Sequence, residues 1–150
     1  MKAVIYARAA EENTVTTNNA LQKQIATCYE YASKNSYEVE AVYKEVGHAV
    51  DEQRKELQGL IKHVADSKGV ISIILVESAD RISRSLPELV QLNDMIHGLG
   101  AEIVCATASG TDTADSRLVK NIIAVMHQYS REIRSEHIKA VIRRKRNLNN

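Results

Sequence analysis

Apolar and polar positions along the chain predict four strands separated by helices. Two short β-rich runs, Lys2–Tyr6 and Glu102–Ala106, stand near the start and in the last third of the chain. Glu38–Glu45 alternates apolar and polar residues, whereas Val70–Val76 is continuously apolar. A continuous apolar run bounded by turn residues is typical of a strand buried on both faces of a parallel sheet.

Between these runs, apolar residues recur at helical spacing over Leu21–Ala32, Leu57–Val64 and Leu89–Leu99, and again in a long final segment, Asp115–Arg146. Ala9–Asn18 has no apolar period, so we expect a loop there, with Asn18 or Asn19 capping the following helix. Thr107–Thr113 is expected to be a second loop. The alternation of strands and helices predicts an α/β fold with a mostly parallel sheet of four to five strands.

Composition places the chain among ordinary globular proteins and excludes several classes. Of its 150 residues, 44% are hydrophobic and 26% charged, which argues against disorder. No apolar run approaches the length of a membrane-spanning helix, and Arg8 comes too early for a signal peptide, so a cytoplasmic protein is expected. The two cysteines form no metal-binding motif, and we expect no metal.

Charge is distributed unevenly. Residues 131–150 carry seven Lys or Arg and two Glu, while the first 130 residues have more acidic than basic side chains. A basic tail on a near-neutral body is consistent with a polyanionic partner. It is equally consistent with a solvated helix end, where cations favour the helix dipole. The candidate anion-binding residues are Lys139, Arg143, Arg144, Lys145 and Arg146.

Arginines also follow three of the predicted strands. Arg8 follows the first strand, Arg54 the second, and Arg81 and Arg84 the third, together with Asp80. If the strand order begins 2-1-3, these loops meet at the carboxyl edge of the sheet, where open α/β sheets bind ligands. The chain has no glycine-rich phosphate loop, so no nucleotide cofactor is expected.

Clustered guanidinium groups suit a phosphate or phosphodiester, because they bind its oxygens bidentately and stay charged at any working pH. Asp80 is then expected to hold one of the arginines in place. The alternative is that Asp80, Arg81 and Arg84 form a surface ion-pair cluster at a helix start.

Three motifs, in this order along the chain, resemble those of the serine recombinases of the resolvase/invertase family. They are Tyr6-Ala7-Arg8, Leu21-x-x-Gln24 and Asp80-Arg81-Ile82-Ser83-Arg84-Ser85. The resemblance extends over essentially the whole chain. It implies a resolvase-like three-layer catalytic body over residues 1–113. It also implies a long C-terminal helix over residues 114–150 for dimerisation and DNA contact, with no separate DNA-binding domain.

In that family a serine hydroxyl attacks a DNA phosphodiester and forms a phosphoserine link without metal or cofactor. The resemblance makes Arg8, Arg54, Arg81 and Arg84 phosphate-binding residues, with Asp80 as the accompanying acid and Gln24 as the glutamine of the first helix. It implies DNA as a partner, through the phosphate backbone, and a homodimer or tetramer formed through the last helix.

The serine position is the main departure, because Ala10 stands there and has no hydroxyl to attack phosphorus. We therefore expect the chain as written to be inactive. The loop around His48-Ala49 also departs from the family pattern.

Two explanations for Ala10 remain open. One is a natural loss of catalysis, and the other is a deliberate serine-to-alanine change in a piece cut to the catalytic domain. Ser83, Ser85 and the threonines Thr14, Thr16 and Thr17 are more simply explained as loop or capping residues than as substitute nucleophiles. The alternative function is a catalytically dead regulatory or protein-interaction module, paired with an active recombinase.

Overall fold

A computed structural model describes residues 1–47, 54–109 and 125. The chain divides into two compact units, Met1–Asp112 and Thr113–Asn150, and all but one of the described residues belong to the first. Apart from Val125, the predicted C-terminal helix with its basic residues lies outside the described residues, as does the His48-Ala49 loop, so these expectations stay predictions.

Four parallel strands form one sheet in the order β2-β1-β3-β4. The order begins 2-1-3, which is the arrangement that brings the loops after β1 and β3 together. The strands are β1 (Lys2–Ala9), β2 (Glu38–Val46), β3 (Ile71–Val76) and β4 (Glu102–Cys105).

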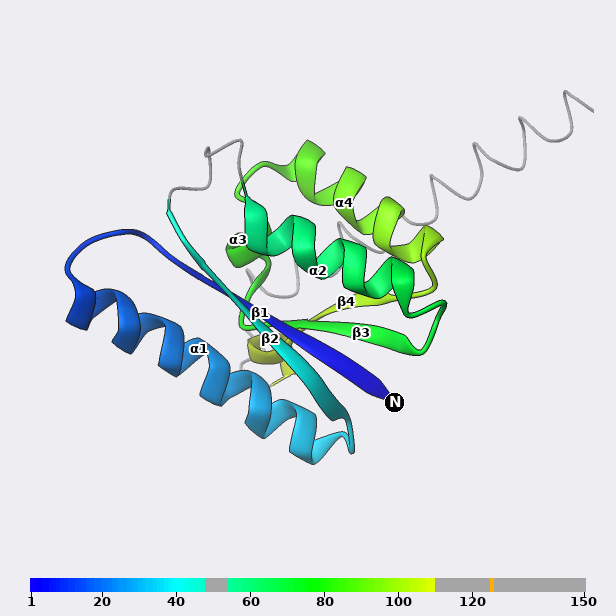
Figure 1. Ribbon diagram of the computed structural model, residues 1–150, viewed down its shortest axis with the longest axis horizontal. Coiled ribbons are helices and arrows are strands. Elements are labelled where there is room, and N and C mark those ends of the chain that lie inside the picture. The colour runs from blue at the N-terminus through cyan, green and yellow to red at the C-terminus, as the bar shows by residue number, and fades with distance from the viewer. Residues whose placement is uncertain (48–53, 110–124, 126–150) are drawn as a thin grey trace, which may run out of the picture. The chain divides into compact units, whose positions relative to one another are not determined.

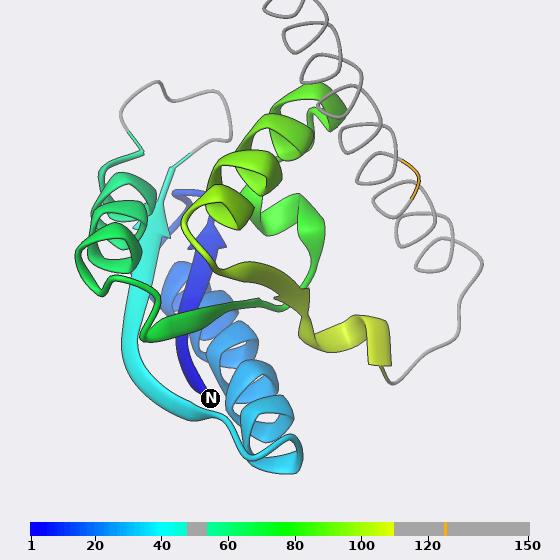
Figure 2. The same cartoon turned by 90° about the vertical axis from the view of Figure 1, so that its right-hand side faces the viewer.

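Helices cover both faces of this sheet (Figures 1 and 2). Helix α1 packs on one face, and α2 and α4 lie on the other, so the predicted three-layer α/β fold is confirmed. The helices are α1 (Thr14–Lys34), α2 (Lys55–Asp66), the single-turn α3 (Ala79–Ile82), α4 (Leu86–Gly98) and the 3₁₀ turn η1 (Ala106–Ser109).

Strand periodicity separates the two sides of the core. Ala3, Ile5 and Ala7 alternate along β1 and join one apolar cluster with Ile25 and Cys28 of α1. In β3 every residue but Ser72 is buried, as the continuous apolar run predicted. Among the described residues, no helix has the length and apolar character needed to span a membrane.

The segment Ala9–Asn18 corrects one prediction. Strand β1 continues to Ala9 and α1 already begins at Thr14, so the expected loop is only four residues long. The cap is Asn13, whose side chain accepts a hydrogen bond of 2.9 Å from the Thr16 amide, not Asn18 or Asn19. The first apolar side chain that α1 buries is Leu21. The turns before it therefore show no apolar periodicity from which the helix could be predicted.

The end of β4 corrects a second prediction. The strand ends at Cys105, and the predicted loop starting at Thr107 instead begins within the 3₁₀ turn. Within this turn the Thr107 amide (3.0 Å) and hydroxyl (2.6 Å) both donate to the carbonyl of Glu77, the residue directly after β3. The polar segments after β3 and β4 are thereby tied together.

Candidate active site

The carboxyl end of β1 is held by the side chain of Gln24 from α1. The Arg8 amide donates to Gln24 Oε1 at 3.0 Å, and Gln24 Nε2 donates to the Arg8 carbonyl at 2.9 Å. Pairing of β1 with β3 ends at Ile5↔Leu75, so Arg8 has no partner strand on that side. The primary amide of Gln24 therefore replaces a neighbouring peptide group and fixes the backbone from which the Arg8 side chain extends.

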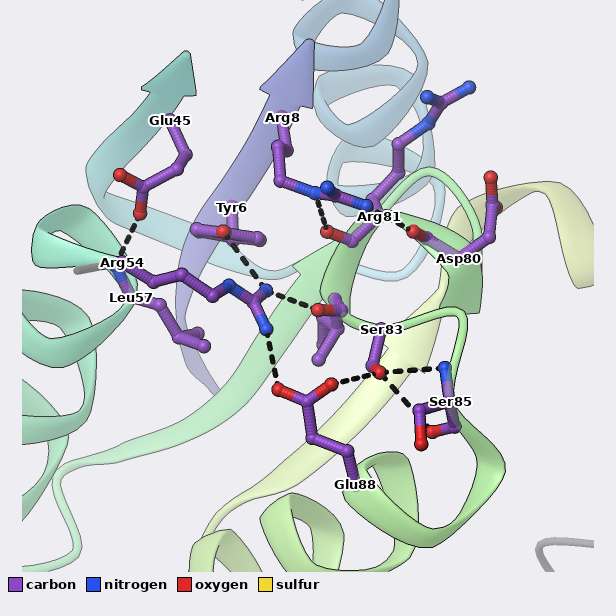
Figure 3. A network of polar contacts seen from close by, with 11 residues as sticks. Tyr6, Arg8, Glu45, Arg54, Leu57, Asp80, Arg81, Ser83, Ser85 and Glu88 are labelled. Atoms are coloured by element: carbon purple, nitrogen blue, oxygen red, sulfur yellow. Dashed lines mark hydrogen bonds and ion pairs between the residues drawn. The ribbon is translucent and has the colours of Figure 1, made fainter. Parts of the chain in front are cut away.

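The Arg8 side chain reaches the segment after β3 (Figure 3). Its Nε donates to the Arg81 carbonyl at 2.8 Å and its Nη2 to the Asp80 carbonyl at 2.7 Å. Carbonyls in the last turn of a helix lack intrahelical partners, and α3 is a single turn. Arg8 therefore caps α3. Burial and the nearby cations Arg54, Arg84 and Arg81 lower its guanidinium pKa from the ordinary value, while the Tyr6 hydroxyl acts in the opposite direction.

Arg54 lies on the other side of α3 and is also turned inward. It is 7% exposed, and its Nη2 donates to the Tyr6 hydroxyl at 3.2 Å and to the Ile82 carbonyl. Its Nη1 forms an ion pair of 3.0 Å with Glu88 of α4. Although Arg54 occupies the N-cap position of α2, its side chain does not cap that helix; Glu45 accepts from the Leu57 amide at 3.0 Å instead.

Asp80 and Arg84 differ from the inward-facing arginines. The Asp80 carboxylate accepts a hydrogen bond from the Ser78 hydroxyl, and its backbone carbonyl, not its carboxylate, meets Arg8. The contact between Asp80 and Arg8 is thus made by the backbone, and α3 places the carboxylate next to its own N-terminal flank; that the Asp80 side chain holds an arginine stays a prediction. Arg84 is exposed, although it lies close enough to Arg8 to affect its pKa.

A cavity of about 210 Å³ opens beside Ala10. Ala10 itself is exposed at the end of β1, and its carbonyl accepts from the Thr17 hydroxyl at 3.2 Å. Arg81 lines the same cavity and pairs with Glu77 at 3.1 Å between Nε and Oε2. Position 10 and an arginine thus share one space, which is also lined by Glu12, Lys23 and Gln24.

The cavity offers charges of both signs, Lys23 and Arg81 against Glu12 and Glu77, beside a position that has no nucleophilic atom. Fixed guanidinium groups stabilise phosphate oxygens, but Ala10 has no nucleophilic atom and the carboxylate of Glu77 offsets the charge of Arg81. Within the described residues, no cluster of His, Cys, Asp or Glu side chains could hold a metal ion.

The structure brings Arg8, Arg54, Asp80 and Arg81 into one region, as the strand order predicted. Glu77 and Glu88 belong to the same network and were missed by sequence reasoning, whereas the Ser83 hydroxyl joins it in the loop role expected of that residue. A charged residue directly after a buried strand was a signal for Glu77. No sequence signal marks Glu88, whose partner Arg54 is 34 residues away.

The family model described as "Resolvase, N terminal domain" matches residues 3–149. No curated protein sequence matches closely enough to count as a relative.

Several solved structures of recombinases have a fold similar to that of this chain. The C-terminal catalytic domain of ISC1926 TnpA, an IS607-like serine recombinase, is 25% identical, with a TM-score of 0.63 over 89% of this chain and 85% of that one. A resolvase family site-specific recombinase from Streptococcus pneumoniae is 19% identical, with a TM-score of 0.65 over 97% and 99%. The N-terminal catalytic domain of TP901-1 integrase is 24% identical, with a TM-score of 0.64 over 89% and 98%. These likenesses agree in fold, and the family match over residues 3–149 shows that the chain belongs to the resolvase N-terminal domain family of serine recombinases.

Proposed function

We propose that this chain is a DNA-associated domain of a site-specific recombination system, acting in the cytoplasm, that binds the phosphate backbone without cleaving it. The observation that carries the proposal is the shared cavity of Ala10 and Arg81 at the carboxyl edge of the sheet. In a family member, that is where a nucleophile and a phosphate ligand would meet. The arginines suit the phosphate, and the alanine removes the covalent step.

Arg81 and Arg84 are the residues we assign to direct phosphate contact. Arg84 is exposed, and the Arg81 side chain is 31% exposed, so both are open to a ligand. Arg8 adds positive potential near these two residues, and its side chain donates to the carbonyls of Asp80 and Arg81 in α3. Gln24 fixes Arg8, and Asp80 orders the entry to α3 through Ser78.

The final segment of the chain has two assigned roles in this proposal. The apolar positions Leu118, Ile122, Val125, Tyr129 and Ile133 would bury against a second subunit in a dimer or tetramer. The basic cluster Lys139, Arg143, Arg144, Lys145 and Arg146 would cross the DNA backbone.

Adduct trapping tests the catalytic half of the proposal. Incubation with supercoiled DNA followed by rapid denaturation should give no covalent protein–DNA species. An adduct mapped to Ser83, Ser85 or a threonine of the α1 start would show that another residue attacks. Ala10→Ser supplies a hydroxyl at the right position, and an adduct formed only by this variant would support the assignment of position 10.

Salt-dependent binding tests the DNA half. If four to six basic side chains of the final segment meet phosphates, log affinity for a long duplex should fall with log salt at a slope of about −4 to −5. Replacing Arg143–Arg146 with glutamine should flatten this slope and weaken binding to every sequence alike. Undetectable binding at low salt would contradict the proposal.

A regulatory module is the second candidate, and one observation favours it. Glu77 and Glu88 each pair with an arginine of the site, which lowers its attraction for phosphate. Such a domain would modulate an active recombinase by joining its assembly. Co-expression with a serine-bearing family member should then yield mixed oligomers with an altered recombination rate, with no requirement for DNA binding by this chain.

A further inference from the structure

We propose that Arg54 and Glu88 act as a positioning pair, which sets the placement of Arg81 and Arg84 without touching the phosphate itself. The inference rests on the proposed function, since it concerns how the phosphate-binding segment is held. It assigns a role to Glu88 and gives Arg54 an indirect one.

The segment Ser78–Ser85 is too short to be stable in this conformation without contacts from other elements. Helix α3 within it has only four residues, whereas isolated helices are marginal even at three times that length. Two arginines from distant elements supply what is missing. Arg8 donates to the carbonyls of Asp80 and Arg81, and Arg54 donates to that of Ile82. Three consecutive carbonyls at the end of α3 thus receive guanidinium donors.

Both terminal nitrogens of Arg54 bind protein partners, while its buried Nε has none within the described residues (Figure 3). Besides the Ile82 carbonyl, its fork holds the Tyr6 hydroxyl and the Glu88 carboxylate, and its guanidinium carbon lies 5.9 Å from the centre of the Tyr6 ring. A phosphate could reach this 7% exposed side chain only by displacing those partners. The side chain of Arg81, by contrast, points away from Arg54 in Figure 3.

Glu88 extends the pair to the other end of the segment. One carboxylate oxygen binds Arg54, and the second accepts from the Ser83 hydroxyl. Ser83 Oγ in turn accepts from the Ser85 amide at 2.9 Å. Arg84 therefore lies between two residues that are joined to each other, and its backbone is fixed on both sides although its own side chain is exposed.

The charge of Glu88 makes the inference testable, because the two possible roles of Glu88 predict opposite changes in DNA affinity when the charge is removed. If Glu88 only offsets positive potential, Glu88→Gln should strengthen DNA binding. If it positions the segment, the same change should weaken binding despite the gain of one positive charge. The exposed Glu30 on α1 gives a matched control, since Glu30→Gln makes the same change in charge away from this network.

Hydrogen exchange on the intact chain without DNA is the first experiment. Arg54→Lys and Glu88→Gln should each accelerate exchange of the Arg81, Ser83 and Ser85 amides, which donate to Ser78, Ala79 and Ser83. Lysine keeps the charge but cannot reach several acceptors with one fork. Exchange at these amides equal to that of the unaltered chain and of Glu30→Gln would overturn the proposal.

Duplex binding by fluorescence anisotropy is the second experiment. Glu88→Gln should bind about threefold to tenfold more weakly. This is the loss in affinity expected if the segment Ser78–Ser85 loses one hydrogen bond and must become ordered when DNA binds. Arg54→Lys should weaken binding similarly, and Glu30→Gln should not. Unchanged or tighter binding by Glu88→Gln would overturn the positioning role. If the unaltered chain binds no DNA, the proposed function fails, while the exchange result still decides whether the pair holds this segment.

Discussion

The segments that follow β1 and β3 meet at the same edge of the sheet, yet they are held in different ways. After β1, the turn is fixed by near neighbours: Asn13 caps Thr16, and the Thr17 hydroxyl bonds the Ala10 carbonyl, three and seven residues apart. After β3, the segment is held by Arg8 from more than 70 residues away and by Arg54 from 28. The first is locally encoded, and the second depends on tertiary structure.

Arg8 joins the two segments. Its backbone is fixed by Gln24 on the β1 side, and its side chain caps α3 on the β3 side. Changes near Arg8 should therefore damage both segments, whereas changes at Asn13 or Glu88 should damage only one.

Gln24→Leu should have the largest effect. It leaves the buried amide and carbonyl of Arg8 without partners, and each such group costs about 1–3 kcal/mol. We expect the free energy of unfolding in urea to fall by about 2–5 kcal/mol. The free energy of unfolding of Gln24→Glu should lie between those of Gln24→Leu and the unaltered chain, because a carboxylate can accept from the Arg8 amide but cannot donate to its carbonyl. Equal stabilities for Gln24→Leu and the unaltered chain would show that β1 needs no surrogate partner.

Arg8→Met should cost less, about 1.5–3 kcal/mol, because it removes charged donors from two carbonyls that water can partly replace. Arg84→Met is the matched control: its side chain is exposed, so the change in unfolding free energy should stay within about 0.5 kcal/mol. Similar losses for the two variants would contradict the division between an inner, capping arginine and an outer one.

Asn13→Ala should destabilise by about 1 kcal/mol, the usual cost of losing an N-cap side chain. Asn18→Ala, at the position first expected to cap, should instead be neutral or slightly stabilising, because alanine favours a helix interior. The effect of Asn13→Ala on hydrogen exchange should be confined to the start of α1. Faster exchange in Ser78–Ser85 would mean that the two segments are coupled beyond Arg8.

The smallest effect concerns alkaline pH and the inner face of α1. Burial raises the pKa of the Cys28 thiol to about 12. The native state therefore keeps a proton that the unfolded chain loses above pH 9, and stability falls as pH rises from about 9 toward 12. At pH 9.5 the loss from this group should be about 1 kcal/mol. Cys28→Ala should show a shallower decline between pH 8 and 9.5; an equal decline would exclude the thiol as its source.

Sequence patterns predicted the sheet because its residues carry their own signal. The apolar run of β3 has no other stable location than between two layers, and its burial follows directly. Once the order 2-1-3 is assumed, the meeting of Arg8 with Asp80 and Arg81 follows from topology alone. The start of α1 could not be predicted in this way, because its first turns pack polar or small residues.

The direction of the arginine side chains was also beyond sequence reasoning. A guanidinium that binds phosphate and one that caps a helix look identical in the chain, and only the position of an acceptor distinguishes them. For Arg54 the acceptors are Ile82 and Glu88, neither of which belongs to a recognisable motif with it. The motif predicted the place of these residues but not their partners.

The central position of β1 has a consequence for how the chain folds. Lys2 pairs with Glu38 on one side and with Ile71 on the other, so β1 is synthesised before both of its neighbours and is completed only after a long stretch of chain has followed. The pairs within this sheet are parallel, and parallel pairing needs crossover connections and not hairpins. High contact order of this kind slows folding. Until β3 emerges from the ribosome, β1 presents an apolar strand with a bare edge, which is the form of nascent chain that chaperones protect from aggregation.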